Sequence, residues 1–274
     1  MIATALGVAG LSALAKVAGK TVASEAILFV ASVISLALVT PLVVRRGLPA
    51  LSTQHPFLHL LRGLAGCLAW YLYFLAIRWI PLIDAVLMIN TAPLWVPLLL
   101  WIWLKRQPDS RLWGGIILGL VGVVLILHPG REVFSPAIFL GLGSGVCLGV
   151  VFITVGMLSR TESNVLILFY YFLISSVAAA PLLMDRWPTP DPETWLILIL
   201  IGLLLAGGQF TVTWSLAKAP ASVVSPLYYL SVVFTGLIDW LIWKQVPDWL
   251  SLLGAALVIG GGTWTVLVGR NQHL

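Results

Sequence analysis

Ten long apolar runs, separated by short polar breaks, make up most of this 274-residue chain. Each run is about 18–24 residues long, which is the length of helix that crosses a hydrocarbon core of roughly 30 Å. The runs cover about residues 2–19, 25–44, 57–79, 82–104, 110–128, 135–157, 163–183, 194–217, 220–243 and 248–269. The pattern therefore predicts an all-α polytopic membrane protein with ten transmembrane helices.

The composition excludes several other classes of protein. Apolar residues form 60% of the chain and charged residues 9%, whereas about a quarter of the residues of a soluble domain are charged. The formal net charge is +5, but the Lys and Arg residues stand singly or in pairs between the runs and form no patch that could hold a nucleic acid. We therefore expect a multi-pass protein of the cytoplasmic (inner) membrane, surrounded by the lipid bilayer, with no nucleic-acid partner.

The chain contains one stretch twice. Residues 81–122 match residues 220–261 without a gap at a shift of 139 positions. The identical pairs include Pro81 and Pro220, Trp101 and Trp240, Lys105 and Lys244, Pro108 and Pro247, Asp109 and Asp248, Gly115 and Gly254, and Gly122 and Gly261. Because each copy holds five runs, an odd number, the second copy enters the membrane upside down. We expect residues 1–131 to form the first five-helix repeat and residues 132–274 the second, inverted repeat, an architecture typical of carriers that open alternately to either side.

The distribution of basic residues predicts the orientation. With both termini in the cytoplasm, nine Lys and Arg residues lie on the inner side and six on the outer side, and an excess of basic residues inside is the usual bias. The outer set includes Lys16, which stands within the first run and makes it the least regular of the ten. We therefore expect cytoplasmic N- and C-termini.

Motifs of enzymes and metal sites are incomplete in this sequence. Residues 19–21 end like a nucleotide-binding P-loop, but the first glycine of that motif is missing. His55 and His59 have the i, i+4 spacing of zinc ligands without a third ligand nearby, so we interpret them as a solvated pair. Cys67 and Cys147 stand alone in apolar runs and are expected to be packed thiols. The sequence thus predicts a protein that is not an enzyme and holds neither a metal nor a cofactor.

Small residues recur at helical spacing in two runs. Gly141, Gly145 and Gly149 form a ladder on the sixth run, and Gly115 and Gly119 lie about one turn apart on the fifth. Small residues let helices approach closely where lipid supplies no hydrophobic drive. These faces either pack inside one bundle or form a dimer seam, so we expect a monomer or a weak homodimer.

Polar residues form a stripe along the ninth run. Ser225, Tyr228, Ser231, Thr235 and Asp239 fall within about 60° of one another at 100° per residue. Facing lipid would leave these groups unpaired, so the stripe is expected to face the bundle interior or a watery cavity. Hydrogen bonding between helices, without a substrate, is the alternative.

The fourth run carries polar residues at mid-depth. Asn90 and Thr91 come just before Pro93 and Pro97, which free helical carbonyl groups and predict a kink. Under the repeat shift Asn90 corresponds to Tyr229. A kink with an amide beside it offers a hinge and a ligand surface.

These observations together predict a set of candidate residues for a central cavity. Gln209 follows two glycines midway along the eighth run, and aromatic rings with polar edges stand on the third and seventh runs. Polar groups at membrane depth are functional hypotheses by default, although each aromatic residue could also serve packing alone. The candidate substrate-binding residues are Trp70, Tyr71, Asn90, Thr91, Trp95, Tyr170, Gln209, Tyr228, Tyr229 and Ser231.

Three ionisable residues are candidates for coupling or gating. We take Asp84 and Asp239 as the carboxylates inside the runs and hence as the candidates for proton coupling. Arg62 lies less than two turns inside the inner end of the third run. Its long side chain either extends to the membrane surface or meets an anionic group of a substrate.

Several motifs resemble those of one family of carriers. They include Leu60-Leu61-Arg62-Gly63, Tyr73-Phe74-Leu75-Ala76, Thr91-Ala92-Pro93-Leu94, Gly208-Gln209-Phe210 and Ser225-Pro226. Across nearly the whole chain the sequence resembles the EamA-type branch of the drug/metabolite transporter superfamily. The resemblance implies ten helices in two inverted five-helix repeats, cytoplasmic termini and a central cavity. It also implies relatives that export amino acids and metabolites or import riboflavin or S-adenosylmethionine.

The chain departs from the pattern of this family at three places. The Gly-Glu pair that commonly follows the fourth and ninth helices of the family is missing here, where the nearest residues are Arg106 and Gln245. The frequent Arg of the second helix is absent from residues 29–32. Any role of those groups in coupling or gating therefore does not carry over to this chain.

We interpret the chain as a secondary active or facilitative transporter that works by alternating access. Its substrate is expected to be a small organic metabolite, either amino acid-like or an aromatic or heterocyclic compound. A pore open to both faces at once is an alternative, although only one run carries a long polar stripe. A non-transporting integral membrane subunit or a lipid-handling protein is the third interpretation.

Overall fold

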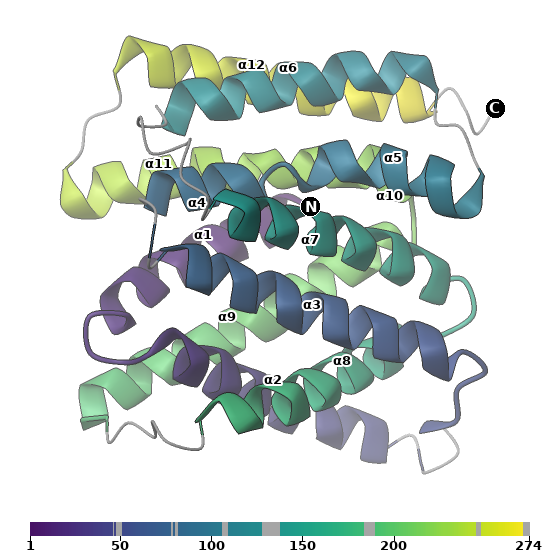
Figure 1. Ribbon diagram of the computed structural model, residues 1–274, viewed down its shortest axis with the longest axis vertical. Helices are drawn as coiled ribbons and strands as arrows, with labels where there is room; N and C mark the ends of the chain where they lie inside the picture. Colours follow the sequence, from purple (N-terminus) through teal and green to yellow (C-terminus); the bar gives the residue numbers. More distant parts are fainter. Residues whose placement is uncertain are drawn as a thin grey trace.

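The computed structural model describes residues 1–45, 47, 51–77, 79, 82–105, 109–127, 138–183, 190–244 and 248–270. The helices in these ranges are α1 (Ile2–Ala18), α2 (Ser24–Val44), α3 (Pro56–Ile77), α4 (Leu82–Ile89), α5 (Ala92–Leu104), α6 (Ser110–Leu127), α7 (Ile138–Leu158), α8 (Asn164–Ala179), η3 (Ala180–Leu183), α9 (Pro192–Leu216), α10 (Ala221–Val224), η4 (Ser225–Tyr229), α11 (Leu230–Trp243) and α12 (Trp249–Arg270). The same ranges contain no β-strand (Figure 1). The described part of the protein is therefore all-helical, as the apolar runs predict.

Two of the predicted runs are broken helices. In the fourth run α4 ends at Ile89 and α5 begins at Ala92. Pro93 lies in the first turn of α5, where its missing N–H group leaves no helical bond unmade. The ninth run is divided into α10, the 3-10 helix η4, which contains Pro226, and α11. The break near Pro93 agrees with the predicted kink, whereas the division of the ninth run is a feature that the sequence analysis did not predict.

The surface of the helices is suited to lipid. Seven helical stretches of the described chain are long and apolar enough to cross a membrane, and α1 and residues 110–126 are shorter apolar helices. Large apolar side chains are exposed along them, for instance Leu203, Phe210 and Trp214 on α9. Soluble proteins rarely expose apolar surface on this scale. The chain is therefore a multi-pass membrane protein.

Most neighbouring helices in the bundle are distant in sequence. Figure 1 shows α6 and α12 together at one end of the long axis and α2 and α8 at the other. The helix contacts come in matching pairs. Helix α1 packs on α9, and α7 packs on α3. In the same way α2 packs on α9, and α8 packs on α3. Likewise α1 packs on α11 as α7 packs on α4 and α5. The α1–α2 turn and the α7–α8 turn lie at opposite ends of the helices, on the left and the right of Figure 1.

Glycines bring α6 and α12 into backbone contact. A Cβ atom added to Gly122 would lie 2.5 Å from the carbonyl oxygen of Gly254, and one added to Gly254 would lie 2.6 Å from that of Gly122. Gly115 and Gly261 are equally close, at 2.7 and 2.5 Å by the same measure. Because residue numbers rise along one helix as they fall along the other, the two helices are antiparallel. The glycine face of the fifth run thus packs inside the bundle, as the first of the two alternatives from the sequence has it.

The glycine ladder on α7 faces the break between α4 and α5. A Cβ atom added to Gly145 would lie 2.5 Å from Oγ1 of Thr91, and one added to Gly149 would lie 3.1 Å from Cβ of Trp95. Gly141 stands in the same way against Met88, at 2.7 Å. The ladder therefore lets α7 support the broken helix closely. This second glycine face also serves packing within one chain.

The residues that directly follow α5 and α11 share an uncommon backbone conformation. Lys105 has a φ of 52° and Lys244 a φ of 57°, both in the left-handed region. Residues with a Cβ atom rarely adopt this conformation, because the side chain approaches the following carbonyl group. The two lysines correspond under the shift of 139 positions. The two copies of the sequence thus end these helices with the same backbone conformation.

Replacing Gly254 by Ala should destabilise the protein, because the added methyl group meets the backbone of Gly122 at 2.6 Å. Overpacking of this kind costs about 1–3 kcal/mol, which lowers the melting temperature of a chain of this length by roughly 2–10 °C. Gly260→Ala on the same helix is the matched control, since the nearest atom, Cδ2 of Leu118, would be 4.0 Å away. Thermal unfolding of the purified proteins in detergent measures both. Equal melting temperatures for the two variants would contradict the close contact.

Candidate functional site

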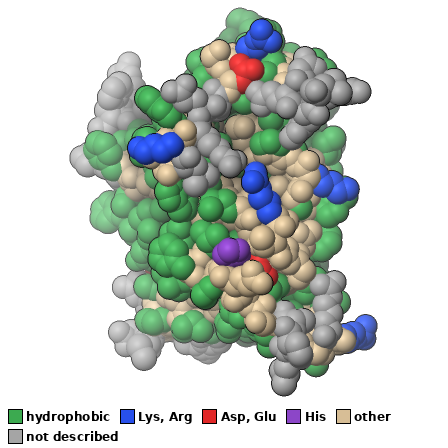
Figure 2. Space-filling view, turned by 90° about the vertical axis from the view of Figure 1, so that its right-hand side faces the viewer, with side chains coloured by type: hydrophobic (Ala, Val, Ile, Leu, Met, Phe, Trp, Pro, Cys, Tyr) green, Lys and Arg blue, Asp and Glu red, His purple; other side chains and the backbone are tan. Residues whose placement is uncertain are grey.

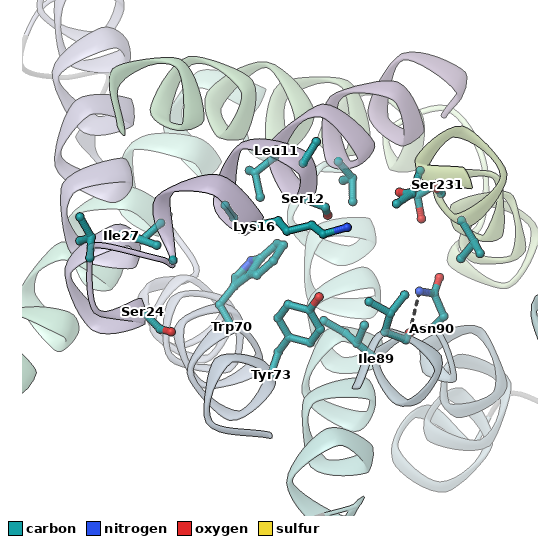
Figure 3. A pocket seen from close by; sticks show the side chains of 18 of the residues that line it. Leu11, Ser12, Lys16, Ser24, Ile27, Trp70, Tyr73, Ile89, Asn90 and Ser231 are labelled. Atoms are coloured by element: carbon teal, nitrogen blue, oxygen red, sulfur yellow. Dashed lines mark hydrogen bonds between the residues drawn. The ribbon is translucent and has the colours of Figure 1, made fainter. Parts of the chain in front are cut away.

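A cavity of about 510 Å³ lies between α1, the start of α2, α3, α4 and the segment from η4 into α11 (Figure 3). Its polar and aromatic lining residues are Ser12, Lys16, Lys20, Ser24, Trp70, Tyr73, Asn90, Tyr228, Ser231 and Thr235. Residues 19, 20, 22 and 23 of the α1–α2 connection also line it, so the cavity reaches that end of the bundle. Mostly apolar hollows of this size with a few polar groups are typical sites for small organic molecules.

Helix α3 supplies the aromatic wall of the cavity. Trp70 and Tyr73 are three residues apart and so lie on one face of the helix. Their rings meet edge to face, with centroids 6.0 Å apart. Trp70 is thus a wall of the cavity, as predicted. Tyr73 is a wall residue that the sequence analysis did not select, and its spacing from Trp70 was the signal that could have found it.

Asn90 lies where α4 ends. Its Nδ2 donates a hydrogen bond to the carbonyl oxygen of Val86 at 2.9 Å, drawn as the dashed line in Figure 3. Its Oδ1 is buried and has no hydrogen-bond partner among the described residues. A buried amide oxygen without a donor is unfavourable. The break in the helix therefore leaves an unsatisfied acceptor just behind the cavity wall.

The polar stripe of the ninth run faces the interior. Tyr228, Ser231 and Thr235 line the cavity, and Ser225 is fully buried. Ser231 donates to the carbonyl oxygen of Tyr228 at 2.7 Å, and Thr235 donates to that of Ser231 at 2.8 Å. The stripe lies as predicted over these four residues. Its fifth member, Asp239, has a side chain outside the described part of the structure, as does Asp84.

Lys16 is a cavity residue that the sequence analysis did not select. It counts toward the outer side in the predicted orientation, and α1 places its exposed side chain in the cavity lining. Figure 3 shows its amino group pointing into the cavity from the face of α1 that also carries Ser12. A lysine inside an apolar run is the signal that could have found it, because charges at that depth are usually functional.

The cavity narrows beyond Trp70 and Tyr228, along the route that leads to the other end of the bundle. A hollow of about 30 Å³ lies there, lined by Trp70, Gln209 and Tyr228 among others. Oε1 of Gln209 accepts a hydrogen bond from Nη2 of Arg62 at 2.7 Å. The guanidinium carbon of Arg62 lies 3.7 Å from the centroid of the Tyr171 ring. Gln209 thus belongs to the closed continuation of the cavity rather than to the cavity itself.

Arg62 does not extend to the membrane surface. Its side chain is only 1% exposed, because Gln209 on α9 and Tyr171 on α8 hold the guanidinium group inside the bundle. The first of the two alternatives from the sequence is therefore wrong. Depth along a helix cannot reveal whether a residue faces lipid or protein.

Three candidates, Tyr71, Thr91 and Tyr229, are sequence neighbours of cavity residues but do not line the cavity. Thr91 donates its hydroxyl to the carbonyl oxygen of Met88 at 2.6 Å. The Tyr229 ring packs against Gly119 of α6, where a Cβ atom would lie 2.6 Å from it. Adjacent residues of a helix point about 100° apart. Their neighbours Trp70, Asn90 and Tyr228 therefore face the cavity, while these three residues do not.

The candidate Trp95 also lies away from the cavity. Its Nε1 donates to Oγ1 of Thr91 at 3.1 Å, and its Cβ faces Gly149 of α7. Trp95 therefore contacts both the α4–α5 break and α7.

Hydrogen bonds close the end of the bundle opposite the cavity. Thr53 donates its hydroxyl to Oε1 of Glu162 at 2.7 Å, and the backbone N–H of Gln54 donates to the same oxygen at 3.3 Å. The candidate Tyr170 donates its hydroxyl to the carbonyl oxygen of Leu51 at 2.8 Å. The segment before α3 is thereby tied to the α7–α8 turn and to α8.

His59 belongs to this closed end. It is 1% exposed, and its ring lies 4.6 Å from that of Tyr170. Its interpretation as part of a solvated pair with His55 is therefore wrong. Tyr170 has a structural contact here and does not reach the cavity.

Known proteins resemble this chain along most of its length. The profile of the EamA-like transporter family matches residues 1–128 and 135–267. The chain is 29% identical to the pseudopaline exporter of Pseudomonas aeruginosa, over 91% of this chain and 88% of that protein. It is 26% identical to the riboflavin transporter of Vibrio cholerae, over 86% and 80% of the two chains. It is 28% identical to the S-adenosylmethionine uptake transporter of Rickettsia bellii, over 80% and 75%.

The crystal structure of another protein has the same fold. It superposes with a TM-score of 0.82 over 100% of this chain and 98% of that chain, at 20% sequence identity. At this level of identity the likeness concerns the fold alone.

Cysteines placed along the path should react from one side only. A membrane-impermeant thiol reagent, added at the face of the α1–α2 turn, should modify Ser12→Cys and Ser231→Cys at least about tenfold faster than Ser225→Cys, because only a minor state would expose the last. Ser12 and Ser231 line the cavity, whereas Ser225 is 0% exposed. Cys67 and Cys147 are first replaced by Ala. Equal rates at all three positions would contradict a path closed beyond Tyr228.

Proposed function

This chain belongs to the EamA-like transporter family, and from that premise we propose that it carries a small organic metabolite across the cytoplasmic membrane by alternating access. The observation that carries the proposal is the one-sided cavity. About 510 Å³ of space reaches the α1–α2 turn, while the opposite end is closed by the Arg62–Gln209 contact and by the bonds to Glu162. A pore needs a path open to both faces at once, so a carrier fits this arrangement better.

The proposed carrier consists of two inverted repeats, residues 1–131 and 132–274. The antiparallel contact of α6 and α12 supports the inversion, since the shift of 139 positions converts the pair Gly115–Gly261 into the pair Gly254–Gly122. A further pair of contacts supports it on the other side of the bundle. A Cβ atom added to Gly63 would meet Ile174, and one added to Gly202 would meet Ile34, which are equivalent contacts under a shift of 139 or 140.

Inverted repeats supply the second state that transport requires. If the two halves exchanged conformations, the residues equivalent to the cavity lining would open at the other side. The equivalents of Val86 and Asn90 are Ser225 and Tyr229, which are both 0% exposed in the described state. The closed half thus has the same framework as the open half, with its lining packed away.

The proposed orientation has both termini in the cytoplasm, so that the described cavity opens outward. The count of nine inner and six outer basic residues supports it. Figure 2 looks onto the end of the bundle opposite the α1–α2 turn and shows Lys and Arg side chains spread over it. The scattered charges fit a surface that meets water and lipid headgroups, without a single patch for a nucleic acid.

The cavity favours a substrate with both an aromatic or apolar part and polar groups. Trp70 and Tyr73 can stack on a flat ring, and Asn90, Tyr228 and Ser231 offer hydrogen-bonding groups. The pseudopaline, riboflavin and S-adenosylmethionine transporters among its relatives support a small organic metabolite of this kind. They are transporters rather than enzymes or structural subunits, which speaks against the non-transporting alternative.

Coupling and assembly remain predictions within this proposal. Asp84 and Asp239 are still the candidates for proton coupling, and their side chains lie outside the described residues. A monomer is favoured over a homodimer, because the two glycine faces are used within the chain.

Removing polar groups from the cavity should slow transport without unfolding the protein. A thermal-shift screen over amino acids, riboflavin and adenosyl compounds identifies a ligand, and counterflow of that ligand is then measured in proteoliposomes. Asn90→Ala and Tyr228→Phe each remove one hydrogen-bonding group from the wall, which is worth about 0.5–1.5 kcal/mol and so roughly a 2- to 10-fold slower exchange at low ligand concentration.

Thr263→Ala is the control for these two variants. Thr263 is exposed on α12, and its hydroxyl donates to the carbonyl oxygen of Ile259 within its own helix. It should exchange at the wild-type rate. Full activity in both cavity variants would remove the site from the proposal, and uptake that does not saturate and does not respond to internal ligand would favour a pore.

A further inference from the structure

Arg62 is a buried charge with few partners. It is 1% exposed. Among the described residues it makes a hydrogen bond from Nη2 to Gln209 and stacks over the Tyr171 ring. Its Nε and Nη1 atoms are buried and have no hydrogen-bond partner among the described residues. Both contacting side chains are neutral. A guanidinium group held in this way is unfavourable, because burial removes its hydration and the surroundings return no opposite charge.

Arg62 stands on the transport path, one step beyond the cavity. Along α3 it comes eight residues before the wall residue Trp70, a distance of about 12 Å at 1.5 Å per residue. Gln209 connects the two, because it bonds to Arg62 and also lines the small hollow next to Trp70 and Tyr228. A molecule that leaves the cavity past these two rings therefore meets Gln209 and then Arg62.

The repeat predicts what surrounds Arg62 when the closed side opens. The equivalent of Arg62 in the second half is Ile201. Ile201 lines a hollow that shares Leu11, Ile27 and Trp70 with the open cavity. If the two halves exchange conformations, Arg62 takes the position that Ile201 has now. It then lies next to the cavity that opens on the other side. This step rests on the proposed function, since it uses the exchange of conformations between the two halves.

We propose that Arg62 and Gln209 form a carboxylate-binding subsite on the closed side of the path, and that the transported metabolite carries a carboxylate group. The planar guanidinium group presents paired N–H donors that match the two oxygens of a carboxylate. In the described state the amide oxygen of Gln209 occupies one donor. When the substrate arrives, its carboxylate takes the place of that neutral oxygen and satisfies the donors that are now without a partner.

The neighbours of Arg62 prepare it for this role. The Tyr171 ring, 3.7 Å from the guanidinium carbon, fixes the plane of the group. A Cβ atom added to Gly66 would lie 3.0 Å from Nη1 of Arg62. Glycine at this position therefore leaves space beside that nitrogen. Gln209, once released, can turn its amide N–H donors toward the substrate. The alternative, that Arg62 only fastens α3 to α8 and α9, makes a different prediction about ligand preference.

Matched acids and amides test the subsite. The probes are L-phenylalanine, L-tryptophan and L-methionine, each compared with its carboxamide, and binding to the full-length protein is measured by thermal shift and by inhibition of counterflow. The wild-type protein should bind at least one acid about tenfold or more tightly than its amide, since the charged bidentate contact is lost in the amide. Arg62→Gln should reduce that preference to within about twofold, and Arg62→Lys should keep part of it.

Two controls separate binding from folding. Arg111→Gln removes the same charge from an exposed position on α6 and should keep the wild-type preference. In the wild-type protein, modification of Arg62 by phenylglyoxal, followed by mass spectrometry, should be slowed by the preferred acid and not by its amide. This second measurement needs no variant, so it decides the question even where Arg62→Gln does not fold.

The outcomes distinguish this inference from the proposed function. Equal binding of every acid and its amide by the wild-type protein overturns the subsite, as does a full preference in Arg62→Gln. If riboflavin or another panel compound is exchanged without any preference for carboxylates, the carrier stands and only the subsite falls. If no compound is bound or exchanged, the proposed function falls with it.

Discussion

Close approach of helices through glycine is the constraint on which the rest of the structure depends. Within a membrane, lipid gives no hydrophobic force that would draw helices together, so contact between backbones has to supply the attraction. The α6–α12 pair meets at Gly122 and Gly254, where a Cβ atom would come within 2.6 Å of a carbonyl oxygen. On the other side α7 meets the α4–α5 break at Gly145. That contact holds Asn90 and Thr91 where the helix is interrupted, and the interruption forms one wall of the cavity.

In the proposed inverted repeat, the two halves share a framework but differ in the side chains that line it. Trp70 of the open cavity corresponds to Gln209 of the closed side, and Lys16 corresponds to Gly156 at the shift of 140 that aligns the α1–α2 and α7–α8 turns. Arg62, on the closed side, corresponds to the apolar Ile201. In the proposed mechanism the backbone symmetry provides two states of similar energy, while the unequal side chains give each state its own contacts with the substrate. A positive group thus lies on the path in each state, Lys16 in one and Arg62 in the other.

Much of this fold could be predicted from the sequence, because membrane helices are long and their apolar runs are unambiguous. The glycine faces and the stripe from Ser225 to Thr235 were likewise readable from helical spacing. The site was harder. The division of the ninth run at η4 changes the direction of Tyr229 relative to a regular helix, and the burial of Arg62 depends on residues of α8 and α9 that no local pattern reveals. Lys16 was used only to predict the orientation, because the sequence does not show whether a basic residue near the end of a run lines a cavity or lies at the membrane surface.

The most direct test of the central claim measures both ends of the bundle in the same molecules. Spin labels at Lys20 and Leu241 report on the side of the cavity, and labels at Ser52 and Arg160 report on the closed end near the Thr53–Glu162 bond. Pulsed electron–electron double resonance then gives the Lys20–Leu241 distance and the Ser52–Arg160 distance in proteoliposomes, with and without the bound ligand. Alternating access predicts that one distance shortens as the other lengthens. Two distances that lengthen together, or that never change, would contradict the account.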